Sequence, residues 1–358
     1  MRSYRRILVT GGAGFVGASL ALFLKSRIAD AEVVAFDNLH RRGSELALAR
    51  LTAGGVLFRH GDLRQADDLL AVGDVELILD CAAEPSVRSG YGEGLRYLYD
   101  TNLTGTLNTL ELARRHAADV IFFSTSRIYP MQGLQGLPLA EGATRLDLPA
   151  GARGLGWSTA GIAEDFPLPG ARSFYGATKL ASELLIAEYA HAFGLRSLVN
   201  RCGVIAGPWQ MGKVDQGFFV LWAARHCFEG PLGYQGYGGK GLQVRDVLAV
   251  DDLAALLWRQ INHLDELSGR TFNVGGGRAN GVSLQELTQL CEEKTGHRLK
   301  LSVQPETHPA DVPWYIADNA AVTAATGWTP ETTLPRLLDQ VLAWLTQEAV
   351  RLRPLLGA

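Results

Sequence analysis

The sequence predicts an α/β protein built on a doubly wound parallel sheet. Three observations favour this fold class: short apolar strands alternate with helical stretches, a glycine-rich loop follows the first strand, and a carboxylate ends the second strand. Alternating strands and helices form parallel sheets that helices cover on both faces. With 358 residues, the chain is long enough for one large domain and a second lobe.

The expected strands cover residues 7–10, 32–37, 56–62, 76–82, 119–125 and 196–202. Helical stretches are expected at residues 15–27, 104–117, 175–193, 283–296 and 334–350. Residues 131–172 are rich in Gly, Pro and Leu without periodicity, and their length favours a functional loop. We assign residues 1–200 and about 243–278 to the sheet domain, and residues 201–242 and 279–358 to a smaller lobe.

Composition limits the functional classes. A net charge of −3 gives no overall attraction to nucleic acid or to a membrane surface. The four cysteines are widely spaced, which favours reduced thiols in a cytoplasmic protein over a disulfide framework or a zinc site. The expected first strand begins almost at once, and no apolar run is long enough to span a bilayer, so we expect neither a signal peptide nor a membrane segment.

The loop TGGAGFVG connects the first expected strand to the first helix. Gly11, Gly14 and Gly17 permit a sharp turn, close approach of a pyrophosphate to the backbone, and tight packing of helix on strand. The free N–H groups at the helix N-terminus then face the phosphates. This pattern predicts a dinucleotide-binding site.

Asp37 ends the second expected strand, where its carboxylate accepts hydrogen bonds from both ribose hydroxyls and repels a 2′-phosphate. The sequence therefore favours NAD, and Arg41 and Arg42 leave NADP as the alternative. The other expected cofactor contacts follow strands or begin the first helix: Phe15, Val16, Asn38, Asp62, Leu63 and Ala82. Asp62 is a candidate for the adenine edge, with a turn carboxylate as the alternative.

The segment SFYGATKLASELL places Tyr175 and Lys179 on one face of a helix. A phenol has a pKa of about 10, and a nearby ammonium and a positively charged nicotinamide both favour the phenolate and lower that pKa. Tyr175 can then remove a proton from a sugar hydroxyl while hydride leaves the same carbon for NAD. Thr125, at the end of an expected strand, can hold that hydroxyl. We expect these three residues to form the catalytic set, and Tyr175 and Lys179 also to contact the cofactor.

TGGAGFVG, Asp37, Thr125 and YGATK together resemble the extended short-chain dehydrogenase/reductases that modify nucleotide-sugars, over nearly the whole chain. Residues 243–257, 271–277 and 317–330 are also similar to that family. The resemblance implies a Rossmann domain with an interleaved substrate lobe, and Thr125, Tyr175 and Lys179 as catalytic residues. It also implies NAD as cofactor, a nucleotide-diphosphate sugar as substrate, and a homodimer formed through two helices per subunit.

Within this family the chain is most similar to the CDP-paratose 2-epimerases, in the run 125–127, in the run Asp215-Gln216-Gly217 and in the long insertion before the tyrosine. The family's 4,6-dehydratases carry Asp-Glu directly after the threonine. This chain has Ser126 and Arg127 instead, and arginine does not serve as an ordinary acid or base. The resemblance therefore implies an epimerase. The alternatives are a dehydratase, decarboxylase or reductase of the same family, or a non-catalytic NAD-binding sensor.

The expected substrate contacts are Glu84, Arg127, Gln216, Arg245 and Asp311. Arg245 resembles the family arginine that grips the diphosphate, because a guanidinium fork suits phosphate oxygens. The alternative is an ion pair with Asp246 or Asp251. Arg127 either bonds to a sugar hydroxyl or braces its loop. His308 stands where the family has an arginine, so we do not extend that arginine's role to it.

Overall fold

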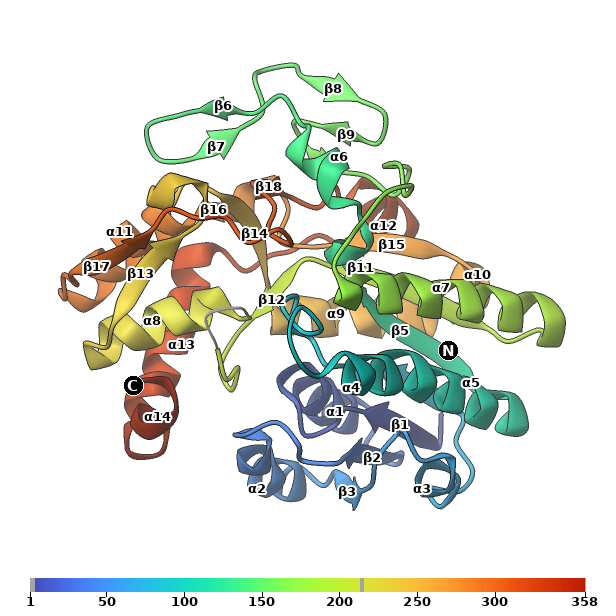
Figure 1. Ribbon diagram of the computed structural model, residues 1–358. Helices are drawn as coiled ribbons and strands as arrows, with labels where there is room; N and C mark the ends of the chain where they lie inside the picture. The colour runs from blue at the N-terminus through green and yellow to red at the C-terminus, as the bar shows by residue number, and fades with distance from the viewer. Residues whose placement is uncertain (1–3, 213–215, 358) are drawn as a thin grey trace.

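The computed structural model describes residues 4–212 and 216–357. Within these residues the largest sheet has seven strands in the order β15-β11-β5-β4-β1-β2-β3, all parallel (Figure 1). These strands are β1 (Arg6–Thr10), β2 (Glu32–Asp37), β3 (Leu57–His60), β4 (Leu77–Asp80), β5 (Asp119–Thr125), β11 (Ser197–Cys202) and β15 (Thr271–Val274). The Rossmann-type sheet that the sequence predicts is confirmed.

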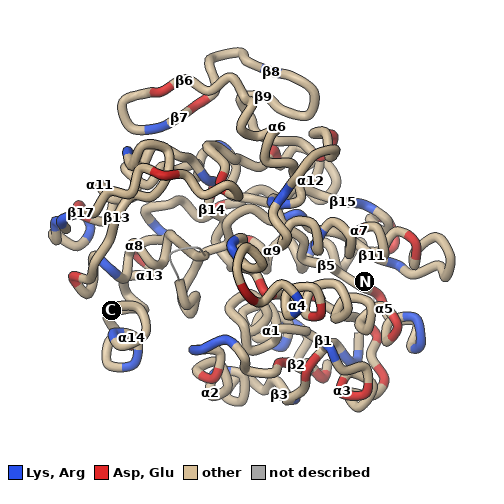
Figure 2. Tube along the Cα trace, viewed as in Figure 1, with Lys and Arg blue, Asp and Glu red and all other residues tan. Residues whose placement is uncertain are grey.

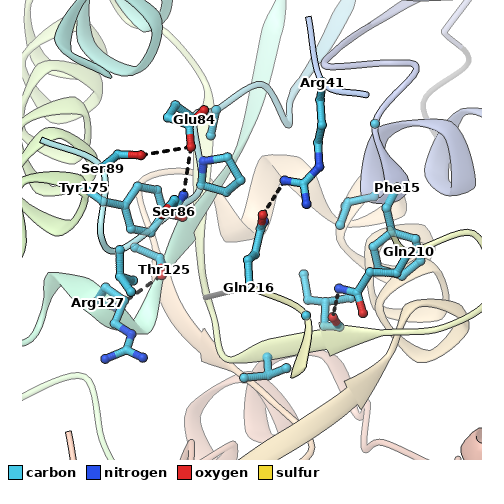
Figure 3. A pocket seen from close by; sticks show the side chains of 18 of the residues that line it. Phe15, Arg41, Glu84, Ser86, Ser89, Thr125, Arg127, Tyr175, Gln210 and Gln216 are labelled. Carbon is cyan, nitrogen blue, oxygen red and sulfur yellow. Dashed lines mark hydrogen bonds between the residues drawn. The ribbon is translucent and has the colours of Figure 1, made fainter. Parts of the chain in front are cut away.

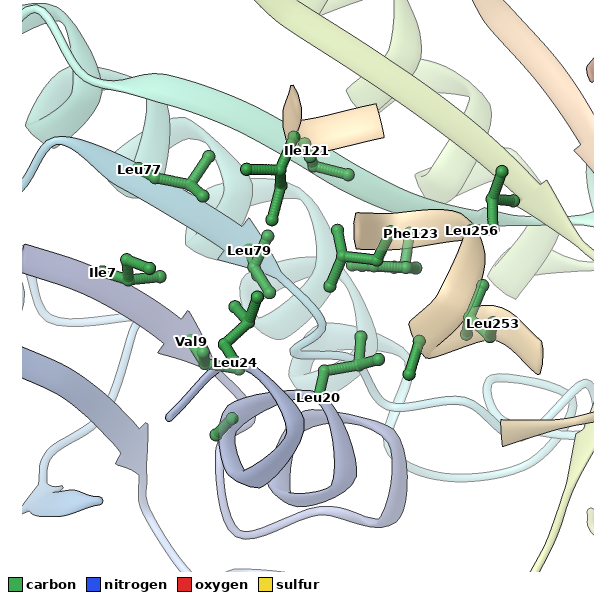
Figure 4. Close-up of a cluster of buried hydrophobic side chains, with 14 of the residues drawn as sticks. Ile7, Val9, Leu20, Leu24, Leu77, Leu79, Ile121, Phe123, Leu253 and Leu256 are labelled. Atoms are coloured by element: carbon green, nitrogen blue, oxygen red, sulfur yellow. The ribbon is translucent and has the colours of Figure 1, made fainter. Parts of the chain in front are cut away.

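Both faces of this sheet are covered because alternate strand residues point to opposite sides. On one face, Val9 and Leu79 pack against α1 (Phe15–Arg27) and α9 (Val250–Asn262), as Figure 4 shows. On the other face, Leu8 and Ile78 share a core with residues of α5 (Gly105–His116) and α7 (Phe174–Phe193). Burial on two sides explains the apolar character of inner strands such as β1 and β4.

The second lobe is built from residues on both sides of β15. One small sheet contains β12 (Val204–Ala206), β14 (Val244–Ala249), β16 (Gly281–Ser283) and β18 (Trp314–Tyr315), and β13 (Leu232–Gln235) pairs with β17 (Leu301–Gln304). Four helices accompany them: α8 (Phe218–Phe228), α11 (Leu284–Thr295), α13 (Leu334–Gln347) and α14 (Ala349–Leu356). Phe219, Leu287 and Leu338 form part of a core separate from that of the large sheet.

Residues 131–172 contain more regular structure than the sequence indicates. They form α6 (Met131–Gln135) and the short strands β6 (Ala140–Glu141), β7 (Leu146–Asp147), β8 (Arg153–Gly154), β9 (Trp157–Ser158) and β10 (Gly161–Ile162). In Figure 1 the strands β6 to β9 lie at the top of the view. Ion pairs of Arg145 with Glu286 and of Asp147 with Arg278 attach this segment to the second lobe.

The remaining elements are short. They are η1 (Ser44–Leu46), α2 (Ala47–Ala53), α3 (Ala66–Leu70), α4 (Leu95–Tyr99), η2 (Asp100–Thr104), η3 (Ser126–Ile128), η4 (Tyr237–Gly239), α10 (Leu264–Leu267), η5 (Arg278–Asn280) and α12 (Ala320–Thr326). Residues of both charge signs are scattered along the chain in Figure 2. In the part of the chain that the structure describes, no helix combines the length and the apolar character needed to cross a bilayer.

Candidate active site

A cavity of about 890 Å³ lies between the carboxyl ends of the large sheet and the second lobe. Ligands of open α/β sheets bind at this edge. Its wall contains most of the residues that the sequence singles out: Gly11, Gly14, Phe15, Val16, Gly17, Asp37, Asn38, Leu63, Ala82, Glu84, Thr125, Arg127, Tyr175, Lys179, Gln216, Arg245 and Asp311. Asp62 is the expected site residue that the wall does not include.

The glycine loop lines the cavity, and its backbone is packed too closely to accept a side chain at Gly11 or Gly17. Gly11 has a φ of +61°, and a Cβ atom there would lie 2.8 Å from the Cα of Ala82. A Cβ atom on Gly17 would collide with the carbonyl oxygen of Gly11. Helix α1 begins at this loop, and its N-cap residue Gly14 makes no side-chain cap. These features fit a pyrophosphate held by backbone N–H groups at a helix N-terminus.

Asp37 lies beside this loop at the end of β2. Its carboxylate accepts hydrogen bonds from the N–H groups of Ala13, at 3.1 Å, and Leu39, at 2.8 Å. Burial raises the pKa of Asp37, and these backbone donors oppose the rise. The N–H donors thus fix the carboxylate on the cavity wall, where the sequence predicts a ribose contact.

Asp62 is not part of the cavity wall, although its neighbour Leu63 is. The side chain of Asn38 donates to the Asp62 carboxylate at 3.1 Å, and Arg64 forms an ion pair with it. The hydrogen bond from Arg64 lowers the pKa of Asp62 to about 2. The contacts of Asp62 are those of a carboxylate in a turn, which was the alternative interpretation of the sequence. A contact with adenine stays a prediction.

The cavity brings the three expected catalytic residues together. Thr125 ends β5, and its hydroxyl oxygen accepts a hydrogen bond of 3.2 Å from the N–H of Arg127, which caps η3. Tyr175 and Lys179 lie in the first turns of α7, whose start is capped by the Ser173 hydroxyl. Figure 3 shows Tyr175 and Thr125 next to each other on the wall.

Burial controls the ionisation of this pair. Loss of hydration raises the pKa of Tyr175 to about 12, and a hydrogen bond with Thr125 acts in the opposite direction. Burial also lowers the pKa of Lys179. In the protein alone, desolvation therefore outweighs the neighbouring charges. The lowering of the tyrosine pKa by a bound nicotinamide stays a prediction.

Asp80 lies outside the cavity wall but acts electrostatically on Lys179, and the sequence analysis did not single it out. It is only 1% exposed, at the end of β4, and its carboxylate accepts a hydrogen bond of 2.7 Å from the hydroxyl of Thr10. Of the charges that act on Lys179, Asp80 opposes the lowering of the lysine pKa most strongly. The sequence feature that could have identified Asp80 is a carboxylate inside the apolar run ELILDCA.

Glu84 lies on the cavity wall in the loop after β4. Asn102 fixes the backbone of this loop, because its side-chain oxygen accepts from the Glu84 N–H at 2.7 Å. The Glu84 carboxylate accepts hydrogen bonds from the Ser86 N–H at 3.2 Å and the Ser89 hydroxyl at 3.1 Å (Figure 3). Its contact with a sugar stays a prediction.

At the other end of the cavity, Arg245 of β14 faces the loop before β18. It forms an ion pair with Asp311 and also donates to the carbonyl oxygens of Val244 and Val312. Its ion-pair partner is thus Asp311, and the expected alternatives Asp246 and Asp251 are wrong.

His308 accepts a hydrogen bond from the Ala310 N–H at 3.1 Å. Burial lowers the pKa of His308, which favours the neutral ring. His308 therefore does not supply the positive charge of the arginine that it replaces.

Gln216 contributes a link across the cavity. Its side-chain oxygen accepts from Arg41, which also donates to the carbonyl oxygen of Met211 at 2.9 Å (Figure 3). The link joins the loop after β2 to the second lobe. Asp215, which the sequence resemblance includes, lies outside the described residues. Among the described residues, no cluster of three or more His, Cys, Asp or Glu side chains could hold a metal ion.

The fold and the cavity define a class: a Rossmann enzyme that holds a dinucleotide at its glycine loop beside a tyrosine, a lysine and a threonine. The chain belongs to the NAD-dependent epimerase/dehydratase family, whose sequence profile matches residues 7–275. NAD is therefore its cofactor, and the glycine loop and Asp37 provide a site that fits it.

Two curated relatives carry different activities. The CDP-paratose 2-epimerase of Salmonella typhi is 29% identical over 348 residues, which cover 95% of this chain and 98% of that protein. The dTDP-glucose 4,6-dehydratase of Mycolicibacterium smegmatis is 28% identical over 326 residues, which cover 86% of this chain and 87% of that protein.

A solved structure gives the same fold. The UDP-glucose 4-epimerase of Thermus thermophilus in complex with NAD superimposes with a TM-score of 0.76 at 25% identity, covering 95% of this chain and 99% of that one. The family is thus that of nucleotide-sugar epimerases and dehydratases.

Proposed function

We propose that the protein is a nucleotide-sugar epimerase that oxidises one sugar carbon to a ketone and then reduces it from the opposite face. The observation that carries this proposal is the cavity in which Thr125, Tyr175 and Lys179 lie together beside the glycine loop. The likeness to the Salmonella typhi epimerase supports a CDP-linked deoxysugar that is inverted at C2.

In this proposal Tyr175 is the general base. Bound NAD supplies the chemistry of accepting a hydride and returning it. Tyr175 takes the proton of the sugar hydroxyl and later gives it back, while Thr125 holds that hydroxyl and shares its proton. Lys179 supplies a positive charge that favours the phenolate. Such a charge is needed because burial raises the pKa of Tyr175 to about 12.

The cofactor-binding set in this proposal is the glycine loop with Asp37 and the expected contacts around them, Asp62 included. On the substrate side, Arg245 and Asp311 hold the diphosphate and the nucleotide ribose. Glu84 and Gln216 approach the ligand from the Rossmann side and from the second lobe, respectively. Each of these side chains except that of Asp62 lies on the cavity wall, which supports the assignment.

The residues after Thr125 favour epimerisation over the other reactions of the family. A dehydratase must move protons while water leaves, and Ser126 and Arg127 provide no ordinary acid–base pair for that step. A reductase would use exchangeable cofactor and change its redox state with each turnover. A non-catalytic NAD-binding sensor has no need for all three catalytic residues.

We further propose a cytoplasmic homodimer. The exposed faces of α5 and α7 carry Leu107 and Leu184, which are 38% and 63% exposed, and Phe193 at the end of α7 is 58% exposed. These two helices pack side by side, so that a second copy can cover both together. The four cysteines are free thiols, which is consistent with a reducing compartment.

The test is product analysis. The purified protein is incubated with CDP-, UDP-, GDP- and dTDP-sugars, and each sugar is followed by NMR together with the redox state of the nicotinamide. An inverted sugar without net formation of NADH supports the epimerase. A dehydrated or decarboxylated sugar, or a net redox change, contradicts it.

A further inference from the structure

Arg127 is a cation in the cavity without a carboxylate partner. Its guanidinium donates one hydrogen bond, to the carbonyl oxygen of Ala310, at 3.3 Å. Among the described residues, no Asp or Glu oxygen lies within ion-pair distance of it. The side chain is partly exposed, and it lines the cavity that contains Thr125 and Tyr175.

The nearest charges do not compensate it. Asp311 acts on Arg127 at longer range, but its carboxylate is engaged by Arg245 at 2.8 Å. Arg245 itself is like-charged and lies close enough to disfavour the charge of Arg127. Burial and this repulsion together lower the pKa of Arg127 to about 10, still well above neutral pH. Arg127 therefore stays charged at neutral pH.

The cavity wall as a whole carries more basic than acidic side chains. Among the described residues on its wall, the cations are Arg41, Arg42, Arg88, Arg127, Lys179 and Arg245. The acidic residues on the same wall are Asp37, Glu84 and Asp311. The first two accept hydrogen bonds from protein donors, and the third pairs with Arg245. Arg127 is left for an anion that enters with a ligand.

We propose that Arg127 forms an ion pair with an oxyanion of the substrate and thereby selects for anionic substrates. A phosphate of the diphosphate and a carboxylate on the sugar share the chemistry that a guanidinium fork recognises. The inference rests on the proposed function, because it takes a nucleotide-sugar as the ligand of this cavity. The inference assigns Arg127 to binding an anion. The sequence left two other roles open, a hydrogen bond to a sugar hydroxyl and support of the loop.

The experiment measures equilibrium binding by calorimetry with the NAD-loaded protein. The probes are CDP or UDP, whichever binds more tightly, and the glucose and glucuronate conjugates of that nucleotide. In Arg127→Gln, we expect the affinity to fall about ten- to a hundredfold, as for loss of a charged hydrogen bond. A loss for all three probes identifies a phosphate as the partner. A loss for the glucuronate conjugate alone identifies a carboxylate. Unchanged affinity for all three overturns the proposal.

Arg88→Gln is the matched control. Arg88 lies on the same wall, is exposed, and donates to the side chain of Gln235 at 3.0 Å. Because solvent screens the charge of Arg88, we expect the affinities of Arg88→Gln for the three probes to stay within about threefold of the wild type. A loss as large as that of Arg127→Gln would show that only overall charge matters, and would overturn the proposal.

Arg127 also holds the Ala310 loop, so its variants need a folding check. The melting temperature and the bound NAD of Arg127→Gln should match those of the wild type. Should that variant not fold, Arg127→Lys carries the test. Lysine keeps the charge but lacks the fork, and a several-fold loss is expected, whereas wild-type affinity contradicts the proposal. Binding requires no turnover, so a protein that binds the probes but inverts none of the sugars in the product analysis contradicts the epimerase and leaves this inference standing.

Discussion

Nη2 of Arg245 lies 2.8 Å from Oδ1 of Asp311, and this ion pair joins β14 to the loop before β18. Both side chains lie on the wall of the cavity, and both are mostly shielded from solvent. The carboxylate holds the guanidinium in one orientation. We therefore treat the two residues as one unit of the proposed substrate site.

This unit predicts non-additive losses of nucleotide affinity. We expect Arg245→Gln and Asp311→Asn each to weaken the binding of CDP or UDP, and the double variant to lose little more than Arg245→Gln alone. The coupling free energy should be about 1 kcal/mol, because residues in contact in one network couple at this level. A double-mutant cycle measured by calorimetry checks this. Additive losses would show that the two residues meet the ligand independently.

Tyr175→Phe should remove the general base while leaving the glycine loop and Asp37 in place. We expect kcat to fall about 10²- to 10⁴-fold, the usual contribution of a positioned acid–base group. The protein should retain NAD, because the glycine loop and Asp37 are unchanged. Steady-state kinetics and the nicotinamide content of the purified variant test both points. A variant that still turns over near the wild-type rate would assign proton transfer to another group.

Asp80→Asn should change the pH dependence of the reaction. Asp80 opposes the lowering of the Lys179 pKa, so its neutralisation lets Lys179 lose its proton at lower pH. The alkaline limb of the kcat profile should therefore move to lower pH. Asp119→Asn is the control, because Asp119 is also buried but lies at the opposite end of the neighbouring strand β5. It should lower stability without moving the limb. An unmoved limb in Asp80→Asn would separate Asp80 from catalysis.

Asp246 should make stability depend on pH. Oδ2 accepts hydrogen bonds of 3.1 Å from the N–H groups of Gly277 and Ala317, and burial raises the pKa of the carboxyl from 3.8 to about 6. A raised folded-state pKa contributes stability that is fully present below 3.8 and is lost as the pH rises through about 6.

Asp246→Asn should not show this loss. Between pH 3.8 and about 6, the free energy of unfolding of Asp246→Asn should rise relative to that of the wild type by about 3 kcal/mol, at about 1.36 kcal/mol per pKa unit. Urea unfolding of both proteins at a series of pH values measures the difference. Parallel curves would mean that Asp246 does not titrate there.

Leu184→Arg should separate the proposed dimer. The substitution places a charge on the exposed face of α7, which a second copy is expected to cover. Light scattering should give the mass of a monomer for this variant and of a dimer for the wild type. Val350→Arg is the control, because Val350 is 92% exposed on α14, away from this face. A dimeric Leu184→Arg variant would place the interface elsewhere.

The sequence predicts most of the large sheet, because inner strands such as β1 and β4 are buried on two sides and read as apolar runs. The edge strand β3 is largely exposed. β2 and β5 have the expected limits, and β15 joins them from a segment more than a hundred residues further on than β5. The glycine loop and the pair of Tyr175 and Lys179 were also accessible, since the spacing within each motif is local in the sequence. The position of Thr125 beside them depends on how β5 meets α7. Residues 131–172 were not, because strands of two residues are too short to show alternation.

Contacts between distant segments were beyond the reach of the sequence. The pairing of Arg245 with Asp311 depends on how β14 meets a loop 66 positions later. The high pKa of Tyr175 depends on how completely the surrounding elements remove water from its hydroxyl. Spacing reveals which residues share a helix face, but it does not reveal how deeply that face is buried.

The central claim is that one carbon of a sugar is oxidised in this cavity and reduced again with the same hydride. The most direct measurement uses a substrate with deuterium at the carbon that product analysis shows to invert, followed by NMR and mass spectrometry in ordinary water. We predict that the inverted product keeps its deuterium, and that Tyr175→Phe forms little of it. Loss of the deuterium to solvent would contradict the claim, because inversion would then proceed by proton exchange without hydride transfer.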